Sequence, residues 1–210
     1  MKIVISENQY KRLIEAKEEG KIIKFPSLEF FDEDREVAWN IIQKILERKG
    51  NPPYSIEGDL NFYNTEIESL GNLISVGGDL DLGRTPIESL GNLISVGGFL
   101  DLGRTPIESL GNLQYVGGFL DLGRTPIESL GNLTSVGGDL YLEKTPIQSL
   151  GNLTSVGGFL DLEKTPIQSL GNLQYVGGDL YLYETPISEK YSEEEIRQMV
   201  NVGGEIYLKL

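Results

Sequence analysis

The sequence predicts a β-solenoid, a repeat protein in which coils of 20 residues stack, with a helical N-terminal cap and a short helix–strand C-terminal cap. A leucine recurs every 20 residues from Leu70 to Leu170, and self-similarity at a short fixed period is typical of solenoids. Within one repeat, leucine alternates with aspartate over residues 79–82, which indicates a short strand with one inward face. Helical spacing of apolar residues appears outside the repeats, chiefly over residues 34–49.

The rest of each coil is predicted to be extended chain and tight turns. After the strand, apolar residues return every three positions between residues 87 and 96, but Pro86 and Gly91 lie among them. Both residue types are unfavourable inside a helix. The pair Gly77-Gly78 precedes the strand, so we expect a sharp corner there, or a positive φ, which glycine adopts most easily.

The repeat pattern LxLxxTxIxxLxxL resembles that of the leucine-rich repeat, with Leu80 and Leu82 as the strand leucines, and the resemblance covers residues 58–210. It is closest to the short bacterial type with an extended back, and the stretch NLTSVGGFLDL at residues 152–162 is similar to the L domains of growth-factor receptors. Thr85 stands where the family has asparagine, so we expect the threonine column to bond to turn backbone. A buried amide ladder is then expected from a different column, formed by Asn72, Asn92, Asn112, Asn132, Asn152 and Asn172.

Three segments follow from these patterns: an N-terminal helical cap over 1–57, the solenoid over 58–187 and a C-terminal cap over 188–210. In the first, Ser6 and Gln9 predict a capped short helix, and residues 34–49 predict a longer helix over the open edge of the first coil. In the last, the sequence SEEEIRQM at 192–199 predicts a helical turn or two before a final strand. The opening MKIVISENQYKRLIEA resembles leaders on proteins of tailed phages and environmental viruses, which implies a possible phage protein.

The charge lies almost entirely on the repeats. The chain has a net charge of −14, whereas residues 1–57 contain ten basic and eleven acidic residues. An acidic repeat region argues against direct binding of nucleic acid or of an anionic membrane. The chain has no cysteine, and it shows neither a secretory signal nor a run of about 20 apolar residues that could span a membrane. We therefore expect a soluble, cytoplasmic protein.

The residue types that enzymes use most often are missing. The sequence has no histidine and no cysteine, which removes the usual general base and the thiol nucleophile. Its carboxylates recur in every coil, so none is distinguished as a catalytic pair. Stacked aspartates could collect Ca²⁺, but arginines in the same coils can offset their repulsion. The sequence therefore predicts no enzyme activity, no cofactor and no metal site.

Residues beside the inward leucines should point outward and form two columns along the solenoid. Inward positions barely change between coils, whereas the outward ones vary, which leaves this face free to encode a ligand. The aromatic rings should be largely accessible, with Phe99 stacked on Phe119, Tyr141 diagonal to Phe119, and Tyr181 diagonal to Phe159. Aromatic anchors among carboxylates suit a basic, partly apolar protein surface; the alternative is that the rings only add cross-strand packing. The predicted partner-binding residues are Phe99, Phe119, Phe159, Tyr141, Tyr181, Asp81, Asp101, Asp121 and Asp161.

Three functions remain open from the sequence. The first is a non-enzymatic interaction module that presents this acidic, aromatic face to a protein partner. The second is an acidic mimic that inhibits a nucleic-acid-binding protein by occupying its basic site. The third is a structural spacer without a specific ligand.

Overall fold

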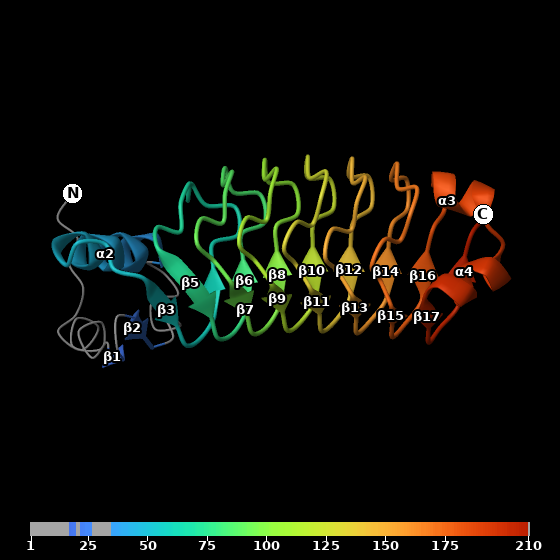
Figure 1. The fold of residues 1–210 in the computed structure, drawn as a ribbon. Helices are drawn as coiled ribbons and strands as arrows, with labels where there is room; N and C mark the ends of the chain where they lie inside the picture. The colour runs from blue at the N-terminus through green and yellow to red at the C-terminus, as the bar shows by residue number, and fades with distance from the viewer. Residues whose placement is uncertain (1–16, 20–21, 27–34, 210) are drawn as a thin grey trace.

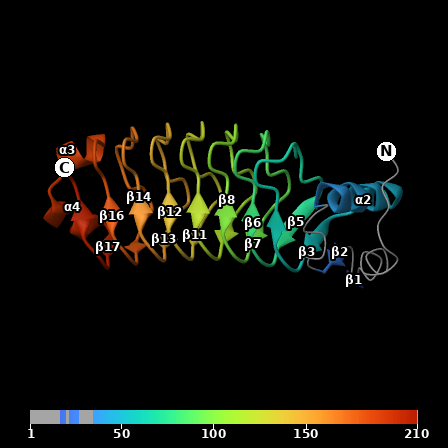
Figure 2. The same ribbon diagram turned by 180° about the vertical axis from the view of Figure 1, so that it is seen from behind.

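The computed structural model describes residues 17–19, 22–26 and 35–209, and it shows the predicted β-solenoid. About 20 residues make one coil, and the coils stack into an elongated row with α2 at one end and α3 and α4 at the other (Figures 1 and 2). The helix predicted around Ser6 and Gln9 lies outside the described residues. No helix within the described part of the chain is long and apolar enough to cross a membrane.

Each coil contributes one strand to each of two sheets, so it has one strand more than the sequence predicted. The strand predicted at residues 79–82 is present as β6 (Leu80–Asp81) in sheet B. The second strand precedes the glycine pair, for example β7 (Ser95–Val96) in sheet A, where we expected extended chain and tight turns. The glycine pair therefore joins two strands.

Sheet A has ten strands among the described residues, all parallel except for the antiparallel pair β1–β2. Its strands, in order, are β1 (Lys17–Glu19), β2 (Ile22–Phe25), β3 (Tyr54–Ile56), β5 (Leu73–Val76), β7, β9 (Tyr115–Val116), β11 (Ser135–Val136), β13 (Ser155–Val156), β15 (Tyr175–Val176) and β17 (Asn201–Val202). Sheet B is parallel and eight-stranded, and each residue pairs with its equivalent in the next coil. Its strands are β4 (Leu60–Asn61), β6, β8 (Leu100–Asp101), β10 (Leu120–Asp121), β12 (Leu140–Tyr141), β14 (Leu160–Asp161), β16 (Leu180–Tyr181) and β18 (Ile206–Tyr207).

The glycine pairs allow the coils to stack closely. None of these glycines has a positive φ. A Cβ atom on Gly97 would overlap the backbone carbonyl of Gly77 in the preceding coil, and the same overlap recurs at Gly117, Gly137, Gly157 and Gly177. The corner was predicted correctly, but the positive φ lies elsewhere. It falls on the glycine before each asparagine, such as Gly91, and on the residue after the sheet B turn, such as Arg84.

The core is a column of identical apolar layers. Leu80, Leu82, Ile87, Leu90 and their equivalents in the following coils are buried. The threonine column is buried with them, and Thr85 Oγ1 donates to the carbonyl of Leu82 at 2.7 Å, as predicted for a turn bond. The predicted asparagine column does bond between coils, for example from Asn92 Nδ2 to Asn72 Oδ1 at 3.1 Å, but the expectation that it is buried is wrong, because Asn92 and the asparagines of the later coils are exposed.

Helix α2 (Arg35–Arg48) closes the N-terminal end of the core. Its apolar face buries Trp39, Ile42 and Leu46. The Trp39 ring lies edge-on to Phe62 of the first coil, with 5.0 Å between ring centroids. The helix thus covers the first coil with apolar side chains, as the sequence predicted.

The C-terminal end begins with two short helices, α3 (Pro186–Lys190) and α4 (Glu193–Met199). Ser192 and Glu195 form a reciprocal capping box at the start of α4, which fixes where that helix begins. Ile196 is fully buried. The chain then returns through β17 and β18, which continue the two sheets by one strand each.

Candidate protein-interaction face

The outer face of sheet B carries an unbroken row of aromatic rings, named here the aromatic ladder. Phe99 and Phe119 stack with 4.6 Å between centroids and 4° between planes, as predicted. Tyr141 then meets Phe119 edge-on at 6.3 Å and Phe159 edge-on at 4.9 Å. The strand register forces these contacts, because equivalent residues of neighbouring coils pair directly.

The ladder continues to the C-terminal end of sheet B. Phe159 contacts Tyr181 edge-on at 5.9 Å, and Tyr181 stacks on Tyr207 at 4.8 Å. Tyr183 lies against both of these tyrosines. The sequence prediction did not include Tyr183 or Tyr207 in the site, although Tyr207 falls in the same outward column as Tyr181 once the 26-residue spacing of the last coil is allowed for.

The ladder rings are half-buried, so the expectation that they are largely accessible is wrong. Each ring covers part of the next one, since parallel strands bring successive coils within about 4.8 Å. By contrast, Tyr115 and Tyr175 on sheet A are 45% and 43% exposed. The ladder therefore presents a continuous strip of ring surface, part of which also stabilises the stack.

The predicted aspartates lie beside the ladder, and each also supports its own turn. Asp81, Asp101 and Asp121 accept hydrogen bonds from the backbone N–H two residues later, at 3.1, 2.8 and 2.7 Å. Asp161 accepts the equivalent bond from Glu163 at 2.8 Å. One carboxylate oxygen of each aspartate is thus used by the turn.

The aspartates that alternate with phenylalanine in the first column bond to the next coil. Asp79 accepts a hydrogen bond from the backbone N–H of Phe99, and Asp139 accepts one from Phe159, both at 2.9 Å. Aspartate is therefore a well-fitting residue in this column. A phenylalanine in this column gives up the hydrogen bond that an aspartate would make to the next coil. The stacking of the coils alone therefore does not explain why phenylalanine occupies these positions.

The carboxylates beside Tyr141 lie in an unfavourable electrostatic environment. Partial burial raises the pKa of Asp121, Asp161 and Glu143 above their ordinary values. Burial, followed by repulsion from Asp139 and from those three carboxylates, raises the pKa of Tyr141. Among the described residues, no ion pair involves Asp121, Asp161 or Glu143. Arg104, Lys144 and Lys164 lie close enough to offset part of this effect, but the pKa of each carboxylate is still raised, so a further cation from a partner would stabilise the charged forms.

A groove of about 250 Å³ runs beside the second column, on the side away from the phenylalanines. Gly83, Gly103 and Gly123 form its floor, whereas later coils have Glu143 or Glu163 in this column. A Cβ atom on Gly103 would lie 3.1 Å from Asp101 Oδ1 and 3.2 Å from Asp121 Oδ2, so carboxylate oxygens converge on the space. The sequence prediction missed this groove; its signal was the change from Gly-Arg to Glu-Lys between coils.

Arginines also line the groove, one after each of these three glycines. The guanidinium of Arg84 lies 5.7 Å from the ring centroid of Tyr63, a cation–π contact. Arg104 and Arg124 are exposed. No group of three or more acidic side chains that could hold a metal ion occurs in the described ranges.

The structure thus brings the predicted aromatic residues together and sets the predicted aspartates beside them. Comparison of the chain with protein-family models, with curated proteins and with solved structures finds no match. What is established is therefore the fold, a β-solenoid of parallel coils of about 20 residues with an N-terminal helix and short C-terminal helices and strands.

Proposed function

We propose that this chain is a non-enzymatic interaction module that binds a basic, partly apolar protein surface through the aromatic ladder and the carboxylates beside it. The observation that supports this most is the environment of Tyr141. Its ring lies between Phe119 and Phe159 and is surrounded by four carboxylates. An arginine or lysine side chain of a partner can stack on such rings and neutralise the carboxylates at the same time.

A relationship to leucine-rich repeats forms part of the proposal. It is supported by the strand leucines, by the threonine turn bond and by a back without helix. The paired strand before the glycine corner adds a second sheet, so the coil has two faces on which residues vary. Only the sheet B face combines a continuous row of rings with carboxylates among the described residues.

The test uses substitutions that the protein already contains in sister coils. Replacing Phe99, Phe119 and Phe159 together by aspartate copies Asp79 and Asp139, whose carboxylates fit this column. The triple variant should stay folded but lose the partner, because it keeps the acidity and removes the rings. The measurement is capture of partners from the native host by immobilised protein, with identification by mass spectrometry, at low salt and at about 0.5 M salt, where exposed charge pairs are screened. Circular dichroism and urea unfolding of each variant check the fold.

The acidic mimic remains a second candidate, because residues 58–210 hold nearly all of the net charge. It predicts the opposite result: the triple variant is more acidic, so it should capture a basic nucleic-acid-binding protein at least as well as the original, and both should release it at high salt. Capture that survives high salt and depends on the phenylalanines supports the aromatic ladder. A spacer would capture nothing specific in either case.

A further inference from the structure

The C-terminal edge of the solenoid is closed along one half and open along the other. In every inner coil, alternate residues direct their backbone groups toward the next coil; Gly203 N–H donates to the carbonyl of Val176, and Leu180 N–H donates to that of Glu205. In the last coil the equivalent outward-facing groups are the carbonyls of Val202 and Gly204 and the N–H groups of Ile206 and Leu208.

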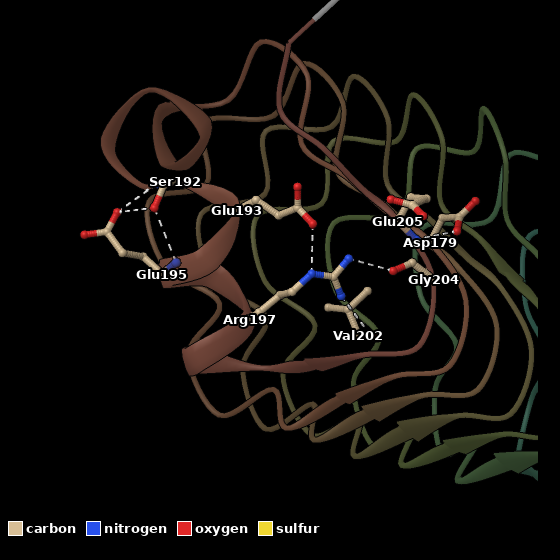
Figure 3. A network of polar contacts seen from close by, with 8 residues as sticks. All are labelled: Asp179, Ser192, Glu193, Glu195, Arg197, Val202, Gly204 and Glu205. Atoms are coloured by element: carbon tan, nitrogen blue, oxygen red, sulfur yellow. Dashed lines mark hydrogen bonds and ion pairs between the residues drawn. The ribbon is translucent and has the colours of Figure 1, made fainter.

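Arg197 closes the first half of this edge. Its guanidinium donates to the carbonyl of Val202 at 3.1 Å and to that of Gly204 at 2.9 Å, and Glu193 holds it at 2.8 Å (Figure 3). In the inner coils the same carbonyls accept N–H groups from the glycine pair of the following coil, as Val176 and Gly178 do from Gly203 and Gly204. One side chain therefore supplies hydrogen bonds to carbonyls that, in the inner coils, accept N–H groups of the following coil.

The second half, β18, has no such replacement. It is the last strand of sheet B, and within the described residues no hydrogen bond involves the N–H groups of Ile206 or Leu208. Unpaired strand edges readily pair with another strand. The neighbouring side chains Glu205 and Lys209 are exposed and carry opposite charges at the two ends of β18.

We propose that β18 pairs antiparallel with β18 of a second copy of this chain, across a two-fold axis at Tyr207. In this register Ile206 lies opposite Leu208 of the other copy, and each such pair exchanges two backbone hydrogen bonds. Glu205 then lies opposite Lys209 of the other copy, on the face that also carries Tyr207. Self-complementarity of this kind is what a two-fold interface requires.

The alternative occupant is a strand of a different protein, but β18 itself favours a second copy. The segment Glu-Ile-Tyr-Leu-Lys (205–209) is complementary to its own reverse in charge and matches it in apolar character. Opposite charges and facing aromatic rings across antiparallel strands are both stabilising. In addition, Tyr207 stacks on Tyr181 within the chain, so pairing would join the aromatic ladders of the two copies end to end. The paired strands are short, so the dimer should be weak.

Reversing the charge of Glu205 or Lys209 tests the proposed register of the two β18 strands. In sedimentation velocity and equilibrium runs on the full chain, from about 10 μM to about 1 mM, the wild type should associate reversibly to a dimer. Glu205→Lys or Lys209→Glu alone places like charges opposite each other and should raise the dimer dissociation constant about tenfold or more. The double variant restores opposite charges and should recover the original association. Glu128→Lys, which makes the same charge change on an exposed loop, is the matched control.

A backbone test is independent of charge. Leu208→Pro removes an N–H that makes no bond within the described chain, and proline is tolerated on strand edges. The Leu208 side chain packs against the edge of the core, so this variant should lose a little stability, but it should stay folded and lose dimerisation. A wild type that stays monomeric up to about 1 mM would overturn the proposal, and so would a dimer that neither the single charge reversals nor Leu208→Pro weakens.

Discussion

A single carboxylate on the outer face of sheet B, that of Asp121, both caps a turn and carries a partly buried charge. Asp121 caps its own turn through the N–H of Gly123, yet partial burial raises its pKa, and the nearby Asp101 adds to the shift. The turn uses this carboxylate as a hydrogen-bond acceptor, whereas its surroundings disfavour the negative charge. The hydrogen bond from Gly123 and the charge of Arg104 offset only part of this shift, so a cation brought by a partner would favour the charged carboxylate.

The pH dependence of stability follows from this. Because the folded state raises the pKa of Asp121, the folded protein binds the proton more tightly, and this contribution to the free energy of unfolding falls as pH rises from the ordinary value through the raised one. Asp121→Asn keeps the acceptor for Gly123 and should raise the urea midpoint at pH 7. The difference should vanish below about pH 4, near the ordinary pKa of aspartate. Glu195→Gln is the opposite control, since hydrogen bonds from Ser192 lower the pKa of Glu195 and its contribution is lost as pH falls; a lower midpoint for Asp121→Asn at pH 7 would contradict the account.

Among the elements, the strands and helices with strong apolar periodicity were predictable, and the strands of sheet A were not. Residues 34–49 predicted α2, and the alternation at 79–82 predicted the strands of sheet B. The strands of sheet A were missed because two-residue strands such as Ser95–Val96 show no alternation of their own and pair only once the coils are stacked. Likewise, the aromatic ladder could be placed from the 20-residue register, but the groove beside it depends on glycine positions that only coil-to-coil comparison distinguishes.

Arg197 of α4 covers half of the C-terminal edge of the solenoid, and its contribution to stability can be measured. Arg197→Gln should lower the free energy of unfolding by about 1–3 kcal/mol, because a charged donor to two carbonyls is lost and the outward carbonyls of Val202 and Gly204 are left without it. Glu193→Gln keeps both of those bonds and removes only an exposed ion pair, which is worth about 0.3–0.5 kcal/mol. Urea unfolding of the two variants gives the comparison. If both variants lost the same free energy of unfolding, Arg197 would act through its ion pair with Glu193 and not through its hydrogen bonds to the two carbonyls.

At the scale of the whole molecule, the solenoid is close to one-dimensional. Each coil contacts chiefly the coils before and after it, through paired strands and stacked apolar layers. Stability in such a protein is a sum of terms for individual coils and for the interfaces between neighbours, so a local defect weakens its own end most. The two ends differ in chemistry: α2 covers the first coil through an aromatic contact, and the Arg197 guanidinium covers half of the edge of the last coil.

This difference predicts how a defect at the N-terminal end spreads. Trp39→Ala removes a ring that packs against Phe62 and Tyr54, and the loss of a buried tryptophan costs about 3–5 kcal/mol. Native-state hydrogen exchange should show that protection falls at the sheet amides of the first two coils, for example Leu60 and Gly77, and falls progressively less toward Leu160 and Leu180. Leu120→Ala, a cavity in the middle of the stack, is the matched control and should lower protection on both sides of its coil. If Trp39→Ala lowered protection equally from Leu60 to Leu180, the chain would unfold as one cooperative unit and the nearest-neighbour description would not hold.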